Sequence, residues 1–241
     1  MKTAVIIPSR YASARFPGKP LALLKGKPLI LHVIERVKKC KRADLAAVAT
    51  DDKRIFDTVK SFGCEVFMTP ASCKSGTDRL AFAAQRHLKD YDIFVNVQGD
   101  EPLMDPALAD LIIDSLKKNK KLECVTAAVR IRQEEDIKDP NIVKVVFDKD
   151  GCALYFSRSP VPYNRDSSKN AKYYKHMGIY GYKRDFLISF SKSKSSMLEK
   201  AEMLEQLRIL ENGKKIKVII SGKDSLGVDT PEDALKAERF L

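Results

Sequence analysis

Two carboxylates follow directly after an apolar stretch near the middle of the chain. Residues 93–97 are Ile, Phe, Val, Asn and Val, which is typical of a buried strand, and Gly99 then precedes Asp100 and Glu101. In open α/β sheets, ligands bind at the carboxyl ends of strands. A carboxylate at such a point is suited to a magnesium ion that carries the phosphates of a nucleotide. The segment therefore predicts phosphate chemistry on a small molecule.

A basic loop near the start of the chain could supply matching positive charge. The loop covers residues 8–20, follows a short apolar stretch and carries Arg10, Arg15 and Lys19. Arginine offers forked donors and lysine a point charge, so together they could neutralise a triphosphate. The loop is not a Walker loop, because Pro20 follows Lys19 and the glycine spacing is wrong. A solvated basic loop is the alternative interpretation.

The elements that must position these residues alternate in type along the chain. This alternation predicts one α/β domain over residues 1–241, a three-layer Rossmann-like mixed sheet with helices on its faces. Predicted strands cover residues 5–7, 45–49, 65–68, 93–97, 124–130, 143–147, 153–157, 176–182 and 217–220. Predicted helices cover residues 28–37, 55–62, 77–88, 106–119, 199–211 and 231–241. Residues 142–190 form a smaller β-rich lobe in this interpretation, because a hairpin signal at residues 148–151 interrupts the alternation.

The charge balance is also compatible with a second class of function, nucleic-acid binding. The chain has 44 Lys and Arg against 32 Asp and Glu, a formal net charge of +12. A basic nucleic-acid-binding protein would have such a balance. However, the lysines are scattered, and no segment combines clustered Arg with interleaved aromatic residues. A solvated basic face without a nucleic-acid partner is therefore favoured.

Composition also limits the compartment and the cysteine chemistry. No apolar run reaches the roughly 18 residues that a membrane span needs, and the N-terminus does not resemble a signal peptide. We therefore expect a cytoplasmic protein with no membrane partner. The five cysteines are odd in number and lack C-x-x-C spacing, which argues against a disulfide framework or a structural zinc site.

Seven segments, in order, give the chain a family resemblance. They are residues 8–21, 75–79, 97–102, 153–158, 178–182, 202–208 and 227–233. Together they resemble the 3-deoxy-manno-octulosonate cytidylyltransferase family, also called CMP-Kdo synthetases, and they run from about residue 5 to residue 233. The resemblance implies a fold of the nucleotide-diphospho-sugar transferase type, with dimer contacts in the smaller lobe. It also implies a cytoplasmic homodimer that makes CMP-Kdo and pyrophosphate from CTP and Kdo for lipopolysaccharide biosynthesis.

The resemblance assigns the phosphate and metal chemistry to residues already singled out. It implies that Asp100 and Asp229 share the cofactor, Mg²⁺, and that Lys19 and Arg10 are catalytic with them. Asp229 precedes Thr230 and Pro231, so starting the last helix is its alternative role. The residues implied to hold CTP are Pro8, Ser9, Arg10, Arg15, Lys19, Ser75 and Gln98.

The acceptor sugar needs groups that bind a carboxylate and several hydroxyls. The resemblance favours Arg79, Gln98, Arg158, His176, Tyr180, Glu205 and Gln206. His176 and Tyr180 would share one side of a strand, where core packing is the alternative role. For Arg79 the alternative is an exposed first-turn position, and for Glu205 and Gln206 a surface helix. A cytidylyltransferase for sialic acid or 8-amino-Kdo is the nearest alternative enzyme.

Overall fold

A single mixed sheet forms the centre of the molecule. The structure is a computed structural model, and it describes residues 1–12, 16–166 and 171–241. Within these ranges the sheet has nine strands, in the order β11-β7-β10-β6-β1-β4-β5, with β8 and β9 joined to it through β10. The larger strands are β1 (Thr3–Ser9), β4 (Leu45–Thr50), β5 (Glu65–Met68), β6 (Ile93–Asn96), β7 (Cys124–Arg130), β8 (Lys144–Phe147), β9 (Ala153–Ser157), β10 (Tyr174–Lys183) and β11 (Lys217–Ser221). A separate short pair is formed by β2 (Leu23–Leu24) and β3 (Lys27–Pro28).

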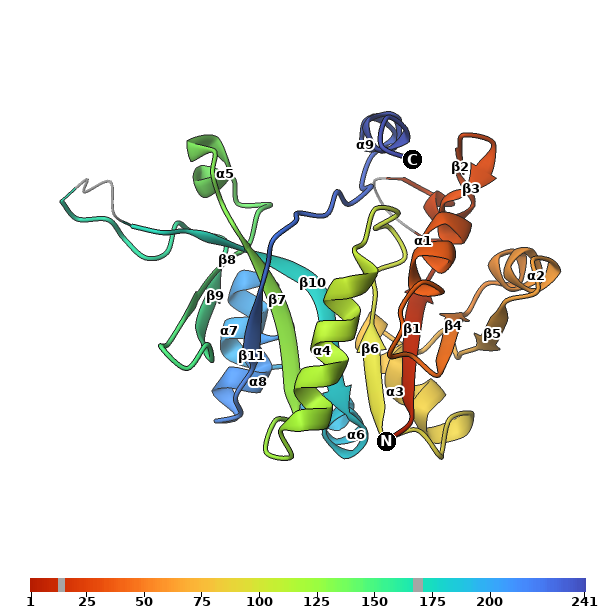
Figure 1. Cartoon of the computed structure of the whole chain (residues 1–241), viewed down its shortest axis with the longest axis horizontal. Helices are drawn as coiled ribbons and strands as arrows, with labels where there is room; N and C mark the ends of the chain where they lie inside the picture. Colours follow the sequence, from red (N-terminus) through yellow and green to blue (C-terminus); the bar gives the residue numbers. More distant parts are fainter. Residues whose placement is uncertain (13–15, 167–170) are drawn as a thin grey trace.

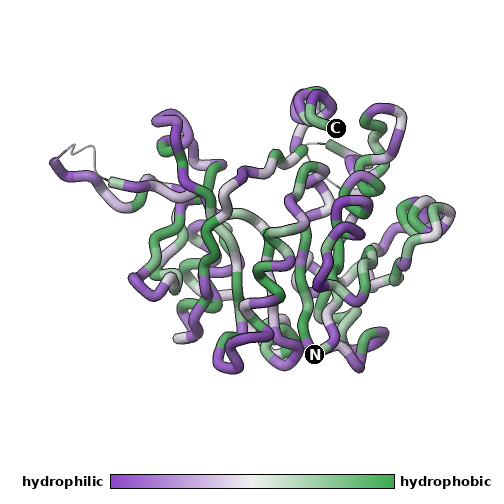
Figure 2. The backbone as a smooth tube through the Cα atoms, in the orientation of Figure 1, coloured by the Kyte–Doolittle hydropathy of each residue, from purple (hydrophilic) through white to green (hydrophobic). Residues whose placement is uncertain are grey.

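The helices lie on both faces of this sheet, which gives three layers (Figure 1). They are α1 (Leu29–Val37), α2 (Lys53–Ser61), α3 (Gly76–Arg86), α4 (Pro106–Lys118), α5 (Glu134–Lys138), α6 (Arg184–Lys192), α7 (Met197–Glu202), α8 (Leu207–Glu211) and α9 (Pro231–Glu238), with a 3₁₀ helix η1 (Lys19–Leu21). One core joins α1, α2 and α4 to the sheet, and a second core joins α3, α6 and α8 to its other face. In Figure 2 the hydrophobic residues accordingly follow the central strands. The predicted three-layer fold is confirmed.

Strand direction places the ends of β1 and β6 together. Ile6 pairs with Asn96 in parallel, and β4 and β5 continue the same direction. On the other side β10 is antiparallel to both β6 and β7, and β11 is parallel to β7. The sheet is therefore mixed, with an edge at which β1 and β6 both terminate.

The predicted hairpin is present, but it belongs to the main sheet. Strand β8 pairs with β9 and also with β10, so the three strands within the range 142–190 are part of the nine-stranded sheet. Residues 158–166 and 171–173 form an arm that projects from the body beyond this hairpin (Figure 1).

The prediction of one helix over residues 199–211 is wrong. Helix α7 ends at Glu202, and Met203 adopts a left-handed backbone conformation with φ of 53° and lies 77% exposed. The chain then turns, and α8 starts at Leu207. Apolar residues at helical spacing hid this break, because Met203 carries no sequence signal for positive φ. The break leaves Glu205 and Gln206 in a turn between two helices.

A small third core fixes the C-terminal segment over the carboxyl edge of the sheet. Leu24, Leu29, Val228 and Ala237 are buried together, so α9 packs beside the β2–β3 pair. Figure 1 shows the chain crossing from β11 to α9 along this edge. No helix within the described ranges has the length and apolar character needed to cross a bilayer.

Candidate active site

The site begins where β1 and β6 end side by side. A Cβ atom added to Gly99 would lie 3.1 Å from the backbone oxygen of Pro8, which is closer than most real contacts allow. Glycine therefore lets the turn after β6 approach the end of β1. This close approach places Asp100 beside the basic loop, as the spacing of residues in the sequence predicted.

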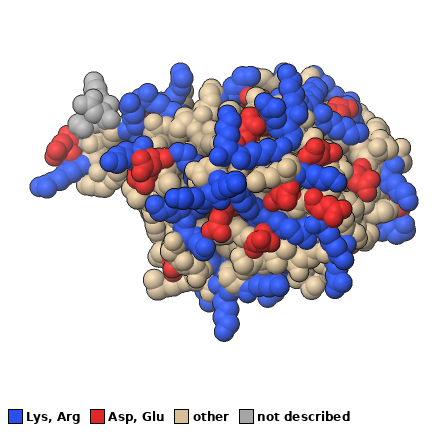
Figure 3. Space-filling view, turned by 60° about the horizontal axis from the view of Figure 1, so that its bottom comes forward, with Lys and Arg blue, Asp and Glu red and all other residues tan. Residues whose placement is uncertain are grey.

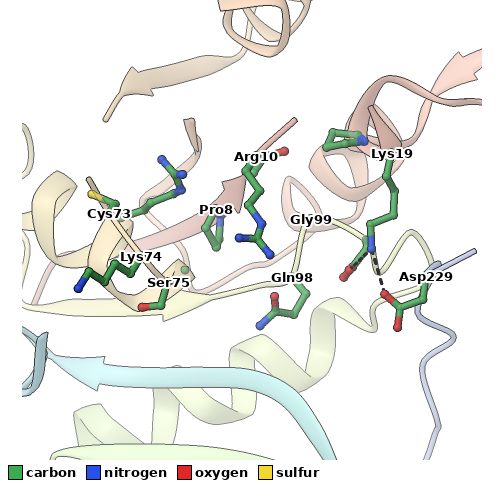
Figure 4. A pocket seen from close by; sticks show the side chains of 14 residues that line it. Pro8, Arg10, Lys19, Cys73, Lys74, Ser75, Gln98, Gly99 and Asp229 are labelled. Atoms are coloured by element: carbon green, nitrogen blue, oxygen red, sulfur yellow. Dashed lines mark hydrogen bonds and ion pairs between the residues drawn. The ribbon is translucent and has the colours of Figure 1, made fainter. Parts of the chain in front are cut away.

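Lys19 joins the two aspartates that were expected to share a metal. Its Nζ atom donates to Oδ2 of Asp100 at 2.6 Å and to Oδ1 of Asp229 at 3.2 Å (Figure 4). The backbone N–H of Val228 donates to the carbonyl oxygen of Asp100 at 2.8 Å, which holds the C-terminal segment against the turn after β6. Gly18, with φ of 72°, provides the left-handed residue that starts the 3₁₀ helix carrying Lys19.

These residues wall a polar cavity of about 380 Å³, called here the phosphate cavity. Six of the seven residues expected to bind nucleotide line it, namely Pro8, Ser9, Arg10, Lys19, Ser75 and Gln98, and so do the two expected metal ligands, Asp100 and Asp229. Arg10 and Gln98 approach each other across it in Figure 4. Arg15 was expected to belong to this group, but it lies outside the described residues.

Ser75 connects the phosphate cavity, which it lines, to the turn between α7 and α8 through a hydrogen bond. It is the N-cap of α3, where its side chain accepts from the backbone N–H of Asp78 in a capping box. Its hydroxyl donates to Oε1 of Glu205 at 3.0 Å, and the Thr77 hydroxyl donates to Oε2 at 2.6 Å. Arg208, itself buried, donates to Oε1 of Glu205 at 2.9 Å. The Glu205 carboxylate therefore already accepts three hydrogen bonds.

A second cavity of about 200 Å³ adjoins the first and is called here the acceptor cavity. Gln98 lines both cavities. Its Nε2 atom donates to the carbonyl oxygen of Gly178 at 3.1 Å, at an irregularity of β10 between Met177 and Tyr180. The acceptor cavity is lined by Thr77, Asn96, Gln98, His176, Gly178, Tyr180, Tyr182, Phe190, Glu205 and Gln206. The structure thus brings five of the seven expected sugar-binding residues together.

His176 and Tyr180 lie on the same face of β10 as expected, and they interact directly. The Tyr180 hydroxyl lies 2.8 Å from Nε2 of His176, and the Thr126 hydroxyl lies 3.1 Å from the same atom. Burial lowers the pKa of His176 to about 3, and burial raises the pKa of Tyr180 well above its usual range. Both side chains are therefore uncharged near neutral pH, which suits hydroxyl groups better than a carboxylate.

Two arginines expected at the acceptor sugar do not line the acceptor cavity. Arg79 is buried and lines the phosphate cavity, where it donates to Asp51 at 2.6 Å and to Thr69 at 2.7 Å. Its charge is thus compensated within the protein, and it is not the exposed first-turn residue considered as an alternative. Arg158 donates to the carbonyl oxygens of Glu202 and Pro140 and lines neither cavity. In this structure both arginines instead form hydrogen bonds to residues at the ends of neighbouring helices and strands.

Comparison with known proteins matches this geometry to a family. A family model described as Cytidylyltransferase matches residues 4–216. A 3-deoxy-manno-octulosonate cytidylyltransferase of Thermodesulfovibrio yellowstonii is 52% identical over 100% of this chain and 98% of its own length. One of Syntrophus aciditrophicus is 50% identical over 100% and 97%. The chain belongs to the 3-deoxy-manno-octulosonate cytidylyltransferase family.

Solved structures support this membership. A CMP:2-keto-3-deoxy-manno-octonic acid synthetase complexed with CTP has a TM-score of 0.94 and 39% identity, and the match covers 100% of this chain and 98% of that one. A 4-diphosphocytidyl-2C-methyl-D-erythritol synthase of Anaerococcus prevotii has a TM-score of 0.66 at 16% identity, over 99% and 97%, which shows a shared fold only.

The carboxylates of this family member fit a magnesium ion. Asp100 and Asp229 converge on one cation, the ammonium group of Lys19, so the fold already places positive charge between them. Among the described residues, no cluster of three or more acidic, His or Cys side chains could hold a metal ion. Magnesium is commonly held by only one or two carboxylates plus water and substrate phosphates, so this pair is sufficient.

Several cavity residues escaped the sequence analysis. Cys73, Lys74 and Gly76 line the phosphate cavity, and Thr77 and Asn96 line the acceptor cavity. Asn96 had a usable signal, since it is a polar residue inside an apolar strand, two positions before Gln98, and strand residues two apart share a face. Cys73 and Lys74 gave none, because they lie in a loop whose path only the fold determines.

Proposed function

We propose that this protein transfers CMP from CTP to 3-deoxy-D-manno-octulosonate, giving CMP-Kdo and pyrophosphate for lipopolysaccharide biosynthesis. The observation that carries the proposal is the junction of two cavities at Gln98. One cavity has cations and carboxylates suited to a triphosphate. The other is suited to a polyol, because its polar groups are mainly uncharged and its one carboxylate, Glu205, is already hydrogen-bonded within the protein. A reaction that joins a nucleotide to a sugar needs both kinds of cavity, and the two cavities must adjoin so that the substrates can meet.

The chain's own residues act mainly by placing the substrates. Arg10 and Lys19 line the phosphate cavity and would hold the phosphate oxygens of CTP, which stabilises the charge that develops on the departing pyrophosphate. The anomeric hydroxyl oxygen of the acceptor would form a bond to the α-phosphorus while the bond from that phosphorus to the bridging oxygen breaks. Pyrophosphate leaves with that electron pair, and the hydroxyl proton passes to solvent.

Asp100 and Asp229 would hold Mg²⁺ in this scheme. When bound, the ion neutralises phosphate charge and orients the reacting groups. Because Lys19 pairs with both carboxylates in the structure, its ammonium would shift towards the phosphates when the ion binds.

We also infer that the protein is a cytoplasmic homodimer. Tyr163 lies 85% exposed on the projecting arm, beside a large open cavity lined by Arg130, Ile131, Tyr173 and other residues of the arm and its base. A large aromatic side chain in such a position favours a protein contact. Sedimentation equilibrium tests this inference: a mass near twice 27.1 kDa supports it and a monomer at all concentrations contradicts it.

Product analysis tests the proposed reaction. The purified protein, incubated with CTP, Kdo and magnesium chloride, should give a new phosphodiester signal in ³¹P spectra and the mass of CMP-Kdo. Parallel incubations with sialic acid and 8-amino-Kdo test the alternative acceptors. If product forms with sialic acid or 8-amino-Kdo but not with Kdo, that acceptor is the substrate in place of Kdo.

A further inference from the structure

Asn96 occupies an unusual place for a polar side chain. It ends β6, between Ile6 of β1 and Tyr180 of β10, and only 4% of it is exposed. Phe94, two residues earlier, packs in the core beneath α3 and α6, so Asn96 points to that same face of the sheet. That face, two residues further along, carries Gln98. Asn96 therefore lines the inner wall of the acceptor cavity.

Within the described part of the chain, the Oδ1 atom of Asn96 is buried without a hydrogen-bond partner. The Nε2 atom of Gln206 is in the same condition, and Gln206 is 8% exposed and lines the same cavity. Buried polar groups in folded proteins nearly always have partners, and an unpaired one destabilises the fold. One cavity wall therefore offers both a hydrogen-bond acceptor and a hydrogen-bond donor to a bound molecule.

Several other polar groups of the cavity already have partners within the protein. The Glu205 carboxylate accepts from Ser75, Thr77 and Arg208, and the His176 ring interacts with the hydroxyls of Tyr180 and Thr126. Gln98 donates to Gly178. Asn96 therefore contributes to this wall a buried acceptor that has no donor among the described residues, and a ligand hydroxyl would be a suitable partner for it.

We propose that Asn96 is a specificity-determining residue that accepts a hydrogen bond from a hydroxyl group of the acceptor sugar, while Gln206 donates to a neighbouring oxygen. This inference rests on the proposed function, because it names a contact to the acceptor of that reaction. A vicinal diol has the donor and acceptor pattern that the two amides match.

The test replaces Asn96 with an apolar residue of nearly the same shape. In Asn96→Leu the KM for Kdo should rise about tenfold to a hundredfold, since the sugar hydroxyl would be buried without a partner. The KM for CTP should stay within about twofold. The melting temperature should stay equal or rise, because an unpaired polar atom has been removed.

A matched control removes another unpaired buried oxygen. Thr3 is fully buried, its Oγ1 atom has no partner among the described residues, and it lies on β1 opposite Ile93, at the far end of the β1–β6 pair. Thr3→Val should stabilise the fold and leave both KM values unchanged. If Asn96→Leu does not fold, Asn96→Ala is read by the same criteria.

Kdo analogues that each lack one hydroxyl give the decisive readout. For the analogue lacking the hydroxyl that contacts Asn96, wild type and Asn96→Leu should have equal KM values, because the contact is absent from both. An equal penalty with every analogue, or a lower melting temperature with a raised KM for CTP, would assign Asn96 a structural role. Wild type that is inactive with CTP and Kdo overturns the proposed function, whereas active wild type with an unaffected variant overturns only this inference.

Discussion

The ammonium group of Lys19 lies 2.6 Å from Oδ2 of Asp100, and it also reaches Asp229 at 3.2 Å. One short loop and two distant segments therefore place a fixed positive charge where two carboxylates converge. Without that charge, the two neighbouring carboxylates would repel each other. Lys19 thus holds the side chains of Asp100 and Asp229 towards one point.

Replacing Asp100 should remove turnover and spare the fold. Asp100→Asn keeps the shape of the side chain but loses the charge that would hold the proposed magnesium ion, so kcat should fall about a thousandfold, equivalent to roughly 4 kcal/mol. The melting temperature should stay within a few degrees. Asp57→Asn on α2, which breaks only an exposed pair with Lys53, is the control and should leave kcat unchanged. Near-normal turnover of Asp100→Asn would remove Asp100 from the mechanism.

Lys19→Met should have opposite effects on turnover and on metal binding. Turnover should fall because a phosphate-binding cation is lost. The affinity of the nucleotide-free protein for Mn²⁺, followed by electron paramagnetic resonance, should rise about tenfold, because the metal no longer competes with the ammonium group. Lys53→Met, at the same exposed pair on α2, is the control. Unchanged Mn²⁺ affinity would show that the two cations do not compete.

Glu205 should affect substrate binding in both cavities, because its carboxylate positions the hydroxyls of Ser75 and Thr77. Glu205→Gln keeps one acceptor oxygen and removes the charge beside buried Arg208, so stability should fall by about 2 kcal/mol. The KM for CTP should rise together with the KM for Kdo, because Ser75 lines the phosphate cavity. Denaturant titration and steady-state kinetics measure both effects. A rise only in the KM for Kdo, with unchanged stability, would make Glu205 a direct sugar ligand, as its family position suggests.

His176 should make the protein sensitive to mild acid. Its folded pKa of about 3 lies below the ordinary value of 6.5, so unfolding takes up a proton between these values. The associated stability is fully present above pH 6.5 and is lost as the pH falls towards 3. From pH 7 to pH 5 the wild type should lose about 2 kcal/mol more than His176→Gln in urea titrations. Equal losses would show that His176 titrates normally in the folded state.

The sequence predicts the parts of this molecule that depend on local pattern. Apolar periodicity located the strands that end at the cavity, and Gly99 and Asp100 indicated a binding edge because ligands in open α/β sheets bind at the carboxyl ends of strands. Alternation also predicted that His176 and Tyr180 share a face. These features follow from short-range geometry, which residue order determines directly.

The remaining features depend on contacts between distant segments. Nothing near Arg79 in the chain indicates that Asp51 and Thr69 would take up its guanidinium group, or that Arg158 would bind two backbone carbonyls. The break at Met203 likewise reflects packing of the turn that carries Glu205, against local helix propensity. Surface charge is a further example: Lys and Arg are spread between acidic residues over one face (Figure 3), so net charge alone does not identify a binding surface.

Pyrophosphate release tests the central claim most directly. Initial rates should be measured for CTP, UTP, ATP and GTP, each with Kdo, sialic acid or no acceptor, in the presence of magnesium. We expect rapid release with CTP plus Kdo, and release at least about a hundredfold slower for the other pairs, because a site built on specific hydrogen bonds rejects substrates that leave them unmade. No release with CTP plus Kdo, or equal release with another triphosphate or acceptor, would contradict the account.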